Sequence, residues 1–323
     1  MKIEGKTFLV TGGAGFIGSY LVKELLKYDI KKIIIYDNFV RGKLSNLNSV
    51  IDDKRLYINE VGGDITDFDI LSRSLKGVEG VFHFAALWLM QCHEFPETAF
   101  KVNVIGSFNI LKACLENKVK KLVISSSASV YGDAISEPMD EQHPFMNKNF
   151  YGATKISQEA ITNAYFHRYG LPFVGLRYMN VYGPGQDYKG AYIAVMMKML
   201  DSIDKNENPV IFGDGSEAFD FIYVKDCAIA NLKAMQSEIS GEFYNIGTGK
   251  KTSLKYLAEK ILKLKKSKLK VSFKPRLSET FVKSRIGSTS KAEKDLSFFS
   301  TTPLDDGLKS LIDWREKDKM VQK

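Results

Sequence analysis

A glycine-rich turn near the start of the chain joins a predicted strand to a predicted helix. The segment 9-LVTGGAGFIGSYL-21 places Gly12, Gly15 and Gly18 three residues apart, between an apolar run and an amphipathic pattern. Glycines at this spacing let the backbone turn tightly and approach a pyrophosphate at the positive end of a helix. The turn therefore predicts a strand–helix–strand unit that binds a dinucleotide, with contacts from the three glycines and from Phe16 and Ile17.

An acidic residue follows at the position that a dinucleotide site requires. Asp37 ends the next apolar run, 19 residues after Gly18, where a carboxylate accepts hydrogen bonds from the adenosine ribose. A carboxylate there repels a 2′-phosphate, so NAD is favoured; Arg41 and Lys43 nearby leave NADP as the alternative. We expect the adenosine half of the cofactor to contact Asp37, Asn38, Arg41, Gly42, Asp64 and Ile65.

Strand and helix patterns alternate up to about residue 180. Apolar runs such as KKIIIYD (31–37) and KLVISSS (121–127) are separated by amphipathic segments, which is typical of parallel strands covered on both faces. The sequence thus predicts an α/β fold, a Rossmann-type doubly wound parallel sheet with a smaller C-terminal α/β substrate lobe. We place the NAD-binding domain at 1–178 with a returning segment at about 222–248, and the substrate lobe at 179–221 and 249–323.

Composition argues against several other classes of protein. The net charge of +8 is concentrated in residues 255–274, where eight lysines accompany apolar residues at helical and then strand spacing. Lysines on solvent-exposed faces account for this pattern, so we expect no nucleic-acid partner. Three widely spaced cysteines and four histidines predict neither a disulfide framework nor a metal site. Because no apolar run reaches membrane-spanning length and no signal-peptide pattern is present, we expect a cytoplasmic protein without a membrane partner.

A tyrosine and a lysine lie one helical turn apart in 150-FYGATKISQEA-160. Tyr151 and Lys155 share a helix face at this spacing, and most such pairs are surface packing. A free tyrosine has a pKa of about 10, which is too high for an efficient base at neutral pH. A neighbouring ammonium group favours the phenolate and lowers that pKa. Spacing alone therefore leaves both packing and catalysis open.

The order of the motifs provides the context that the pair lacks. TGGAGFIG, YDNFVRGK, GDITD, HFAAL, VNVIGSFNIL, SSSASVYGD, YGATK, RYMNVYGPGQ, DFIYVKD and YNIGTGKKTS follow one another along the chain. Together they resemble the extended short-chain dehydrogenases/reductases of the nucleotide-sugar epimerase/dehydratase group, closest to UDP-glucose/UDP-galactose 4-epimerase-like members, over about residues 5–315. The resemblance implies an NAD domain, a lobe for a nucleoside-diphosphate sugar, and a homodimer.

The resemblance also implies roles for individual residues. Tyr151 takes a proton from a sugar hydroxyl while hydride goes to the nicotinamide, Lys155 lowers the tyrosine pKa and holds the nicotinamide ribose, and Ser127 hydrogen-bonds the reacting hydroxyl. Further cofactor contacts implied by the matching motifs are Phe84, Ala85, Ala86, Leu87, Asn103, Ser125 and Met179.

The two residues that directly follow Ser127 help to identify the reaction that the chain catalyses. The family's 4,6-dehydratases carry an Asp–Glu pair there, because elimination of water needs an acid and a base; here Ala128 and Ser129 stand instead. The chain is in this respect similar to 4-epimerases. The alternatives are a 4-dehydrogenase or a 4,6-dehydratase that releases a 4-keto sugar, and, from another class, a non-catalytic dinucleotide-sensing protein.

The substrate side departs from the family pattern. The family usually places an arginine that binds the diphosphate immediately before the Asp-Phe pair, where this chain has Phe219. Arg276 resembles a second phosphate-binding arginine, and Arg285 or Lys283 are alternatives. The bulky Trp88 follows the fourth strand, where it either packs in the core or reshapes the sugar pocket. The substrate contacts that we expect are Trp88, Ser127, Asn180, Phe212 and Arg276.

Overall fold

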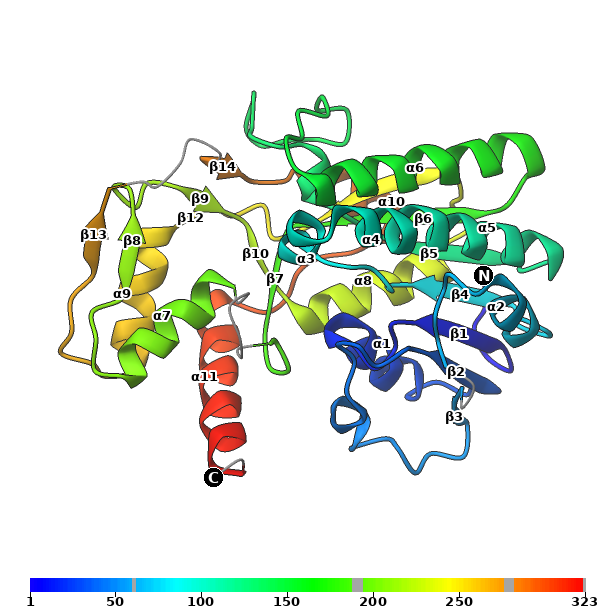
Figure 1. Cartoon of the computed structure of the whole chain (residues 1–323), viewed down its shortest axis with the longest axis horizontal. Coiled ribbons are helices and arrows are strands. Elements are labelled where there is room, and N and C mark those ends of the chain that lie inside the picture. Colours follow the sequence, from blue (N-terminus) through cyan, green and yellow to red (C-terminus); the bar gives the residue numbers. More distant parts are fainter. Residues whose placement is uncertain (60–61, 188–193, 276–281, 322–323) are drawn as a thin grey trace.

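The computed structural model describes residues 1–59, 62–187, 194–275 and 282–321. Its centre is a seven-stranded parallel sheet in the order β11-β6-β5-β4-β1-β2-β3 (Figure 1). The predicted fold class is confirmed. The strands are β1 (Thr7–Thr11), β2 (Lys32–Tyr36), β3 (Leu56–Ile58), β4 (Gly80–His83), β5 (Lys121–Ser127), β6 (Phe173–Tyr178) and β11 (Glu242–Ile246).

Alternate residues of each strand enter two separate cores, one on each face of the sheet. Phe8 and Val10 of β1 pack with one face, whereas Leu9 between them packs with the other. This period of two follows from the pleat, and it explains why the strands are apolar throughout. One core is covered by α1 (Phe16–Leu25), α8 (Val224–Gln236) and α10 (Ser290–Leu296), and the other by α2 (Phe68–Ser74), α5 (Ser107–Glu116) and α6 (Phe150–Tyr169).

The helical segment 96–116 changes its hydrogen-bonding pattern partway along. It forms α4 (Pro96–Ala99), a π-helix η2 (Phe100–Gly106) and then α5, and it is preceded by α3 (Leu89–Glu94). π-Helical turns are frequent at functional sites because they re-aim a side chain within an otherwise regular helix. Here the re-aimed residue is Asn103 in η2, whose role is described below. Short 3₁₀ turns lie at η1 (Leu44–Leu47) and η3 (Ala128–Val130).

A smaller lobe lies beside the sheet and has its own core (Figure 1). The apolar faces of α7 (Val195–Asp204), α9 (Leu254–Leu264) and α11 (Leu304–Val321) meet there. Short strands complete it: β8 (Val210–Phe212) pairs with β13 (Ser272–Lys274), and β9 (Ala218–Phe219) lies between β12 (Thr252–Ser253) and β14 (Ser284–Arg285). At the junction with the sheet, β7 (Asn180–Tyr182) pairs with β10 (Phe221–Tyr223).

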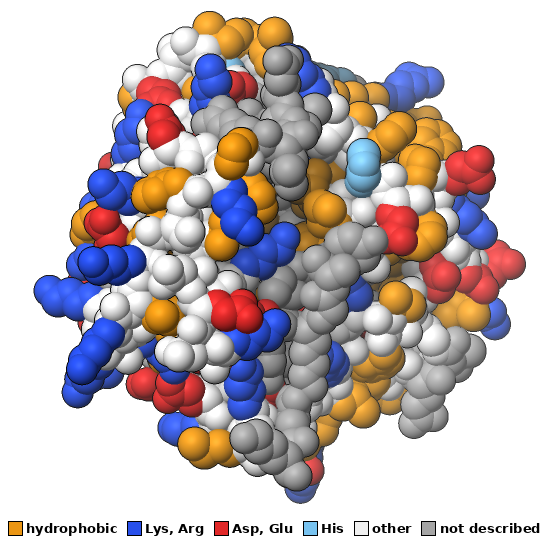
Figure 2. All heavy atoms as spheres, turned by 60° about the vertical axis from the view of Figure 1, so that its left-hand side comes forward, with side chains coloured by type: hydrophobic (Ala, Val, Ile, Leu, Met, Phe, Trp, Pro, Cys, Tyr) orange, Lys and Arg blue, Asp and Glu red, His pale blue; other side chains and the backbone are white. Residues whose placement is uncertain are grey.

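The lysine-rich stretch lies on this lobe. Figure 2, which brings the lobe forward, shows basic side chains interspersed with acidic ones. Lys260 contacts Asp305 at 2.6 Å, and Lys265 contacts Asp204 at 3.3 Å. Ion pairs at the protein surface contribute little stability, and these two account for Lys260 and Lys265 without a partner molecule. Within the described residues, no helix has the length and apolar character needed to cross a membrane.

Candidate active site

The glycine turn adopts the geometry that its sequence predicts. Gly12 has φ +67, and a Cβ on Gly18 would lie 2.3 Å from the Gly12 carbonyl oxygen. Only glycine allows that positive φ without strain and that contact between the turn and helix α1. Gly15 precedes the helix, and Phe16 and Ile17 form its first turn. The N-terminus of α1 is thereby open to an anion, as a pyrophosphate requires.

Asp37 lies at the end of β2 beside this turn. Its carboxylate accepts hydrogen bonds from the amides of Ala14 (3.0 Å) and Phe39 (2.9 Å), and a Cβ on Gly42 would lie 2.6 Å from Asp37 Oδ2. Burial raises the pKa of Asp37, and the two amide donors oppose the shift. The carboxylate is therefore oriented before any ligand arrives. It lines a cavity of about 310 Å³ together with Tyr36, Asn38, Phe39, Gly63 and Asp64, among others.

The residues predicted to contact the cofactor differ in how the structure places them. Asp64 lines this cavity, whereas Ile65 is buried and packs against Gly106. Phe84 and Ala85 donate their amides to Thr11 Oγ1 at the ends of β4 and β1. The turn and the cavity fit a dinucleotide, and the contacts of the individual residues stay predictions. Asn38 and Arg41 are exposed, whereas Ala86, Leu87 and Ser125 are half-buried and Met179 is buried against Gly247 and Gly287.

Ser127, Tyr151 and Lys155 converge from two neighbouring elements. Ser127 is the last residue of β5, while Tyr151 and Lys155 lie in the first turns of α6, whose N-cap Asn149 accepts from the Gly152 amide at 2.8 Å. Lys155 Nζ lies 5.9 Å from the Tyr151 ring centroid and donates to the Ser125 carbonyl at 2.6 Å. The cation, the phenol and the hydroxyl therefore share one small site.

Burial shifts the pKa of both titrating groups toward their neutral forms. It raises the pKa of Tyr151 to about 12, although the Ser127 hydroxyl and the charge of Arg285 act in the opposite direction. It lowers the pKa of Lys155 to about 8. At neutral pH the lysine is thus still mostly protonated, and the phenol needs further positive charge to ionise. An oxidised nicotinamide ring would supply such a charge.

A buried chain of hydrogen bonds connects Lys155 to the glycine turn. Lys155 Nζ donates to Gln158 Oε1 (3.1 Å), and Gln158 Nε2 donates to Ser107 Oγ (2.9 Å). His83 then joins Ser107 Oγ (3.0 Å) to Thr11 Oγ1 (2.8 Å). Because Ser107 donates to the Asn103 carbonyl, and Thr11 accepts from two amides, His83 donates from Nε2 and accepts at Nδ1.

This series of hydrogen bonds holds Lys155 in place, and the histidine within it, His83, is neutral. Burial lowers the pKa of His83 to about 3, with a smaller effect from the charge of Lys155. The histidine is thus a satisfied buried residue, as the apolar run around it suggests. Sequence reasoning missed Ser107 and Gln158, and the available signal was a polar residue at a buried helical position three residues after Lys155.

Asn103 fixes the loop that follows β4. Its Oδ1 accepts from the Leu87 amide at 2.7 Å, and its Nδ2 donates to the Leu87 carbonyl at 3.0 Å and to Thr154 Oγ1 at 3.1 Å. The amide also contacts Cys92 Sγ at 3.4 Å. Asn103 therefore connects the loop after β4 to helix α6 by hydrogen bonds. Its predicted contact with the cofactor stays a prediction.

Two predicted residues contact each other, Arg41 from the cofactor set and Trp88 from the substrate set. The Arg41 guanidinium lies 4.9 Å from the centre of the Trp88 ring and 3.6 Å from Asp187 Oδ2. Trp88 is half-buried there, so it joins the loops after β2 and β4 instead of entering the core. A cation stacked on an indole contributes about 0.5–1 kcal/mol at exposed sites.

The remaining predicted substrate residues lie on the lobe side. Asn180 is half-buried and its amide contacts the Asp220 carbonyl at 3.3 Å, whereas Phe212 on β8 is exposed. Arg276 lies outside the described residues. The Asp220 carboxylate accepts from Thr248 and Gly249, which ties β10 to the loop after β11.

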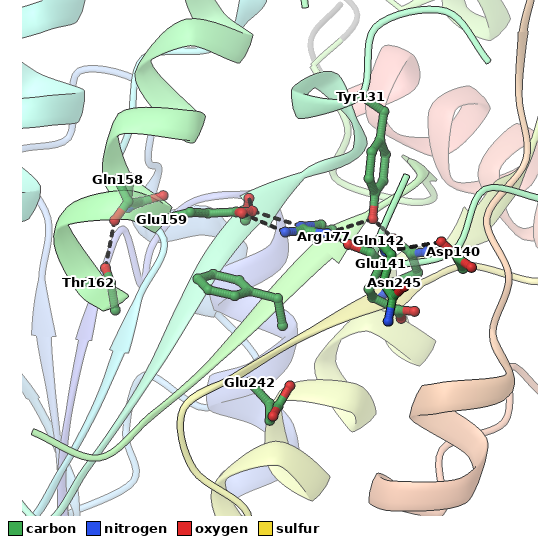
Figure 3. A network of polar contacts seen from close by, with 12 residues as sticks. Tyr131, Asp140, Glu141, Gln142, Gln158, Glu159, Thr162, Arg177, Glu242 and Asn245 are labelled. Carbon is green, nitrogen blue, oxygen red and sulfur yellow. Dashed lines mark hydrogen bonds and ion pairs between the residues drawn. The ribbon is translucent and has the colours of Figure 1, made fainter. Parts of the chain in front are cut away.

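A buried ion pair supports the helix that carries Tyr151 (Figure 3). Arg177 on β6 donates to both carboxylate oxygens of Glu159 on α6, at 2.9 and 2.7 Å. It also donates to Tyr131 Oη at 2.8 Å, and Tyr131 donates to Asn245 Oδ1 at 2.7 Å. Burial acts to lower the pKa of Arg177, and Glu159 more than offsets it. The network joins β6, β11, α6 and the loop after Ser127.

Comparisons with known proteins agree with this geometry. The family described as the NAD dependent epimerase/dehydratase family matches residues 8–247. A protein of Methanocaldococcus jannaschii named as a putative UDP-glucose 4-epimerase is 37% identical over 322 residues, which cover 96% of this chain and 98% of that protein.

Two solved structures are similar over nearly the whole chain. One is a UDP-N-acetylglucosamine 4-epimerase from Methanobrevibacter ruminantium M1 in complex with UDP-N-acetylmuramic acid, with a TM-score of 0.91, 34% identity, and coverage of 98% of this chain and 100% of that one. The other is a UDP-glucose 4-epimerase from Thermotoga maritima with UDP-glucose, with a TM-score of 0.88, 33% identity, and coverage of 97% and 99%.

Proposed function

This chain belongs to the NAD-dependent epimerase/dehydratase family, and from that membership we propose that it inverts C4 of a nucleoside-diphosphate sugar. NAD is the cofactor, and the names of the relatives support UDP as the nucleotide. The observation that carries the proposal is the convergence of Ser127, Tyr151 and Lys155 beside the glycine turn. A binding protein without catalysis has no chemical use for that trio.

The residues of the site account for proton transfer at the C4 hydroxyl. NAD⁺, when bound, supplies the hydride acceptor and a positive charge. Tyr151 takes the hydroxyl proton as phenolate and returns it later, Ser127 orients the hydroxyl, and Lys155 stabilises the phenolate. The keto sugar turns between the two steps, so that reduction on its other face gives the epimer. The loop after β4 borders the site, and Asn103 holds this loop in place by accepting a hydrogen bond from the Leu87 amide.

Epimerisation is favoured over dehydration by the two residues after Ser127. Ala128 and Ser129 are buried in the turn η3, and the Ser129 amide donates to Ser127 Oγ at 3.1 Å. Neither side chain transfers a proton at neutral pH, so loss of water between C5 and C6 lacks its acid and base at these positions.

A panel of nucleotide sugars tests the proposal. We expect incubation of the NAD-loaded protein with UDP-sugars to give a product of identical mass and different retention, without net formation of NADH. A product lighter by one water would identify a dehydratase, and stoichiometric NADH would identify a dehydrogenase. Binding of NAD without turnover of any sugar would favour the sensing protein. Each of these three results contradicts the epimerase.

We also propose that two copies of the chain pair through the helices beside the active site. Along η2, α5 and α6, Phe100, Ile105, Phe108 and Tyr169 are 40–56% exposed, and these helices lie side by side (Figure 1). Apolar side chains gathered on adjacent helices are a common feature of a self-complementary interface. A homodimer that buries them as a four-helix bundle follows.

A charge on this face is expected to separate the copies. The double variant Ile105→Glu/Phe108→Glu should weaken association at least tenfold, because it places four carboxylates in an apolar interface. Light scattering after size exclusion measures the mass. Tyr256→Glu, on α9 and 48% exposed, is the matched control and should leave the mass unchanged. A double variant with the mass of the parent would contradict the proposed interface.

We further propose the cytoplasm as the compartment. Cys92, Cys114 and Cys227 are all buried and free. Free thiols without any disulfide fit a reducing environment.

A further inference from the structure

Arg285 lies where the outer lobe meets the loop that follows β5. Its strand β14 pairs in parallel with β9, which places Arg285 directly beside Phe219. On its other side the segment contacts the loop, since the Ala134 amide donates to the Ser284 carbonyl at 3.3 Å. Laterally paired residues of a sheet point to the same face. The Arg285 side chain therefore lies on the same face of the sheet as the side chain of residue 219. At position 219 the family usually has an arginine, whereas this chain has Phe219.

The charge of this guanidinium has no ion-pair partner among the described residues. Its Nε and Nη2 both donate to the Gly132 carbonyl, at 3.2 and 3.1 Å, and Nη1 has no protein acceptor there. The charge of Asp133 acts on Arg285, but Asp133 Oδ1 accepts from the amides of Lys283 and Ser284. Four other arginines pair with carboxylates, namely Arg41, Arg55, Arg177 and Arg315, whereas Arg73 and Arg168 are exposed to solvent.

A partly buried charge without a counter-charge favours an anionic ligand. Arg285 is half-buried, and burial lowers its pKa to about 10, so it is still charged at neutral pH. Removing a guanidinium from water is unfavourable unless an anion and further hydrogen bonds compensate. An acceptor supplied by the substrate would provide both.

The position of Arg285 indicates which part of the substrate it faces. The Arg285 guanidinium donates to the Gly132 carbonyl, in the loop that follows Ser127, and its positive charge acts to lower the pKa of Tyr151. In the proposed mechanism Tyr151 contacts the C4 hydroxyl, so the guanidinium lies on the sugar side of the site. The other cation there, Lys155, already donates to the Ser125 carbonyl and to Gln158.

We propose that Arg285 binds a carboxylate on the sugar ring, so that the substrate is a nucleoside-diphosphate sugar acid. This inference rests on the epimerase function proposed above. A carboxylate matches the planar fork of a guanidinium and accepts two parallel N–H···O bonds. A C6 carboxylate of a uronic acid and an acidic ether substituent on the ring offer the same chemistry.

Matched acidic and neutral sugars test the inference. UDP-glucuronic acid and UDP-N-acetylmuramic acid are compared with UDP-glucose and UDP-N-acetylglucosamine, using wild type, Arg285→Gln and Arg285→Lys. We expect kcat/KM of the wild type to favour at least one acid by about 10- to 100-fold, and Arg285→Gln to abolish that preference through KM. Arg285→Lys should retain part of it. The preferred acid distinguishes the ring carboxylate from the ether substituent.

The control and the contrary outcomes separate this role from two others. Lys283→Gln removes an exposed positive charge two residues away and should preserve the preference. Weaker binding of free UDP by Arg285→Gln, equal for acidic and neutral sugars, would assign Arg285 to the diphosphate and overturn the proposal. A shifted pH profile of kcat with unchanged KM would assign it to tuning Tyr151, with the same consequence. If neutral sugars are epimerised and neither acid is preferred, only this inference is refuted. If no sugar is epimerised at all, the proposed epimerase function is refuted as well.

Discussion

Replacing Tyr151 with phenylalanine is expected to lower kcat by about 100- to 10,000-fold, the usual contribution of a positioned acid–base group. The change removes one oxygen atom from a half-buried ring and leaves the helix α6 intact. Neither Ser127 nor Lys155 replaces it. Ser127 has no accessible anionic form near neutral pH, and Lys155 is held by the Ser125 carbonyl and Gln158. Substrate interconversion followed by chromatography measures kcat.

The controls distinguish lost chemistry from lost structure. Tyr256→Phe removes the same atom from an exposed ring on α9, outside the site and the proposed dimer face, and should leave kcat within about twofold, since such surface changes are usually mild. Tyr151→Phe should also bind NAD and the nucleotide sugar nearly as wild type does, so the loss lies in kcat and not in KM. A Tyr151→Phe enzyme that turns over its substrate at the wild-type rate would exclude the proton-transfer role.

The parts of the site that were predictable from sequence are those fixed by local geometry. Gly12 and Gly18 are dictated by a positive φ and a close contact within one turn, and Asp37 follows at a fixed distance along the same unit. Tyr151 and Lys155 share one helical turn, so their proximity needed only the helix to form. Ser127 was assigned by resemblance, and the packing of α6 beside the end of β5 brings it to the same site.

The parts that sequence did not predict depend on which elements face one another. The link from Lys155 through Gln158 and Ser107 requires α5 and α6 to pack at one particular height, and no local pattern sets that height. The π-turn that aims Asn103 at Leu87 likewise interrupts a helix whose sequence reads as continuous. The pairing of Arg285 with Phe219 joins segments 66 residues apart in sequence (285 minus 219). The missing arginine at position 219 and the arginine present at position 285 therefore look unrelated along the chain.

The second large effect concerns the buried pair that supports α6. Replacing Glu159 with glutamine is expected to lower the free energy of unfolding by about 3–5 kcal/mol, because it leaves the charge of Arg177 uncompensated in the core. The two side chains are only 4% and 6% exposed, and the carboxylate also accepts from Ser126 Oγ at 2.5 Å. Urea unfolding of the NAD-free protein, followed by tryptophan fluorescence and circular dichroism, measures the change.

The loss of stability in Glu159→Gln should arise because the charge of Arg177 is left unpaired, and not because the attraction between Arg177 and Glu159 is lost. The double variant Glu159→Leu/Arg177→Met removes both charges, so it should be more stable than Glu159→Gln despite altering more atoms. Glu116→Gln provides the surface control: its partner Lys112 lies 3.9 Å away with both side chains about half exposed, and the expected change is below about 0.5 kcal/mol. Equal effects at Glu159 and Glu116 would refute the role of burial. Because the same network holds Tyr131 in the loop after Ser127, Glu159→Gln should also lower kcat at temperatures where the protein is still folded.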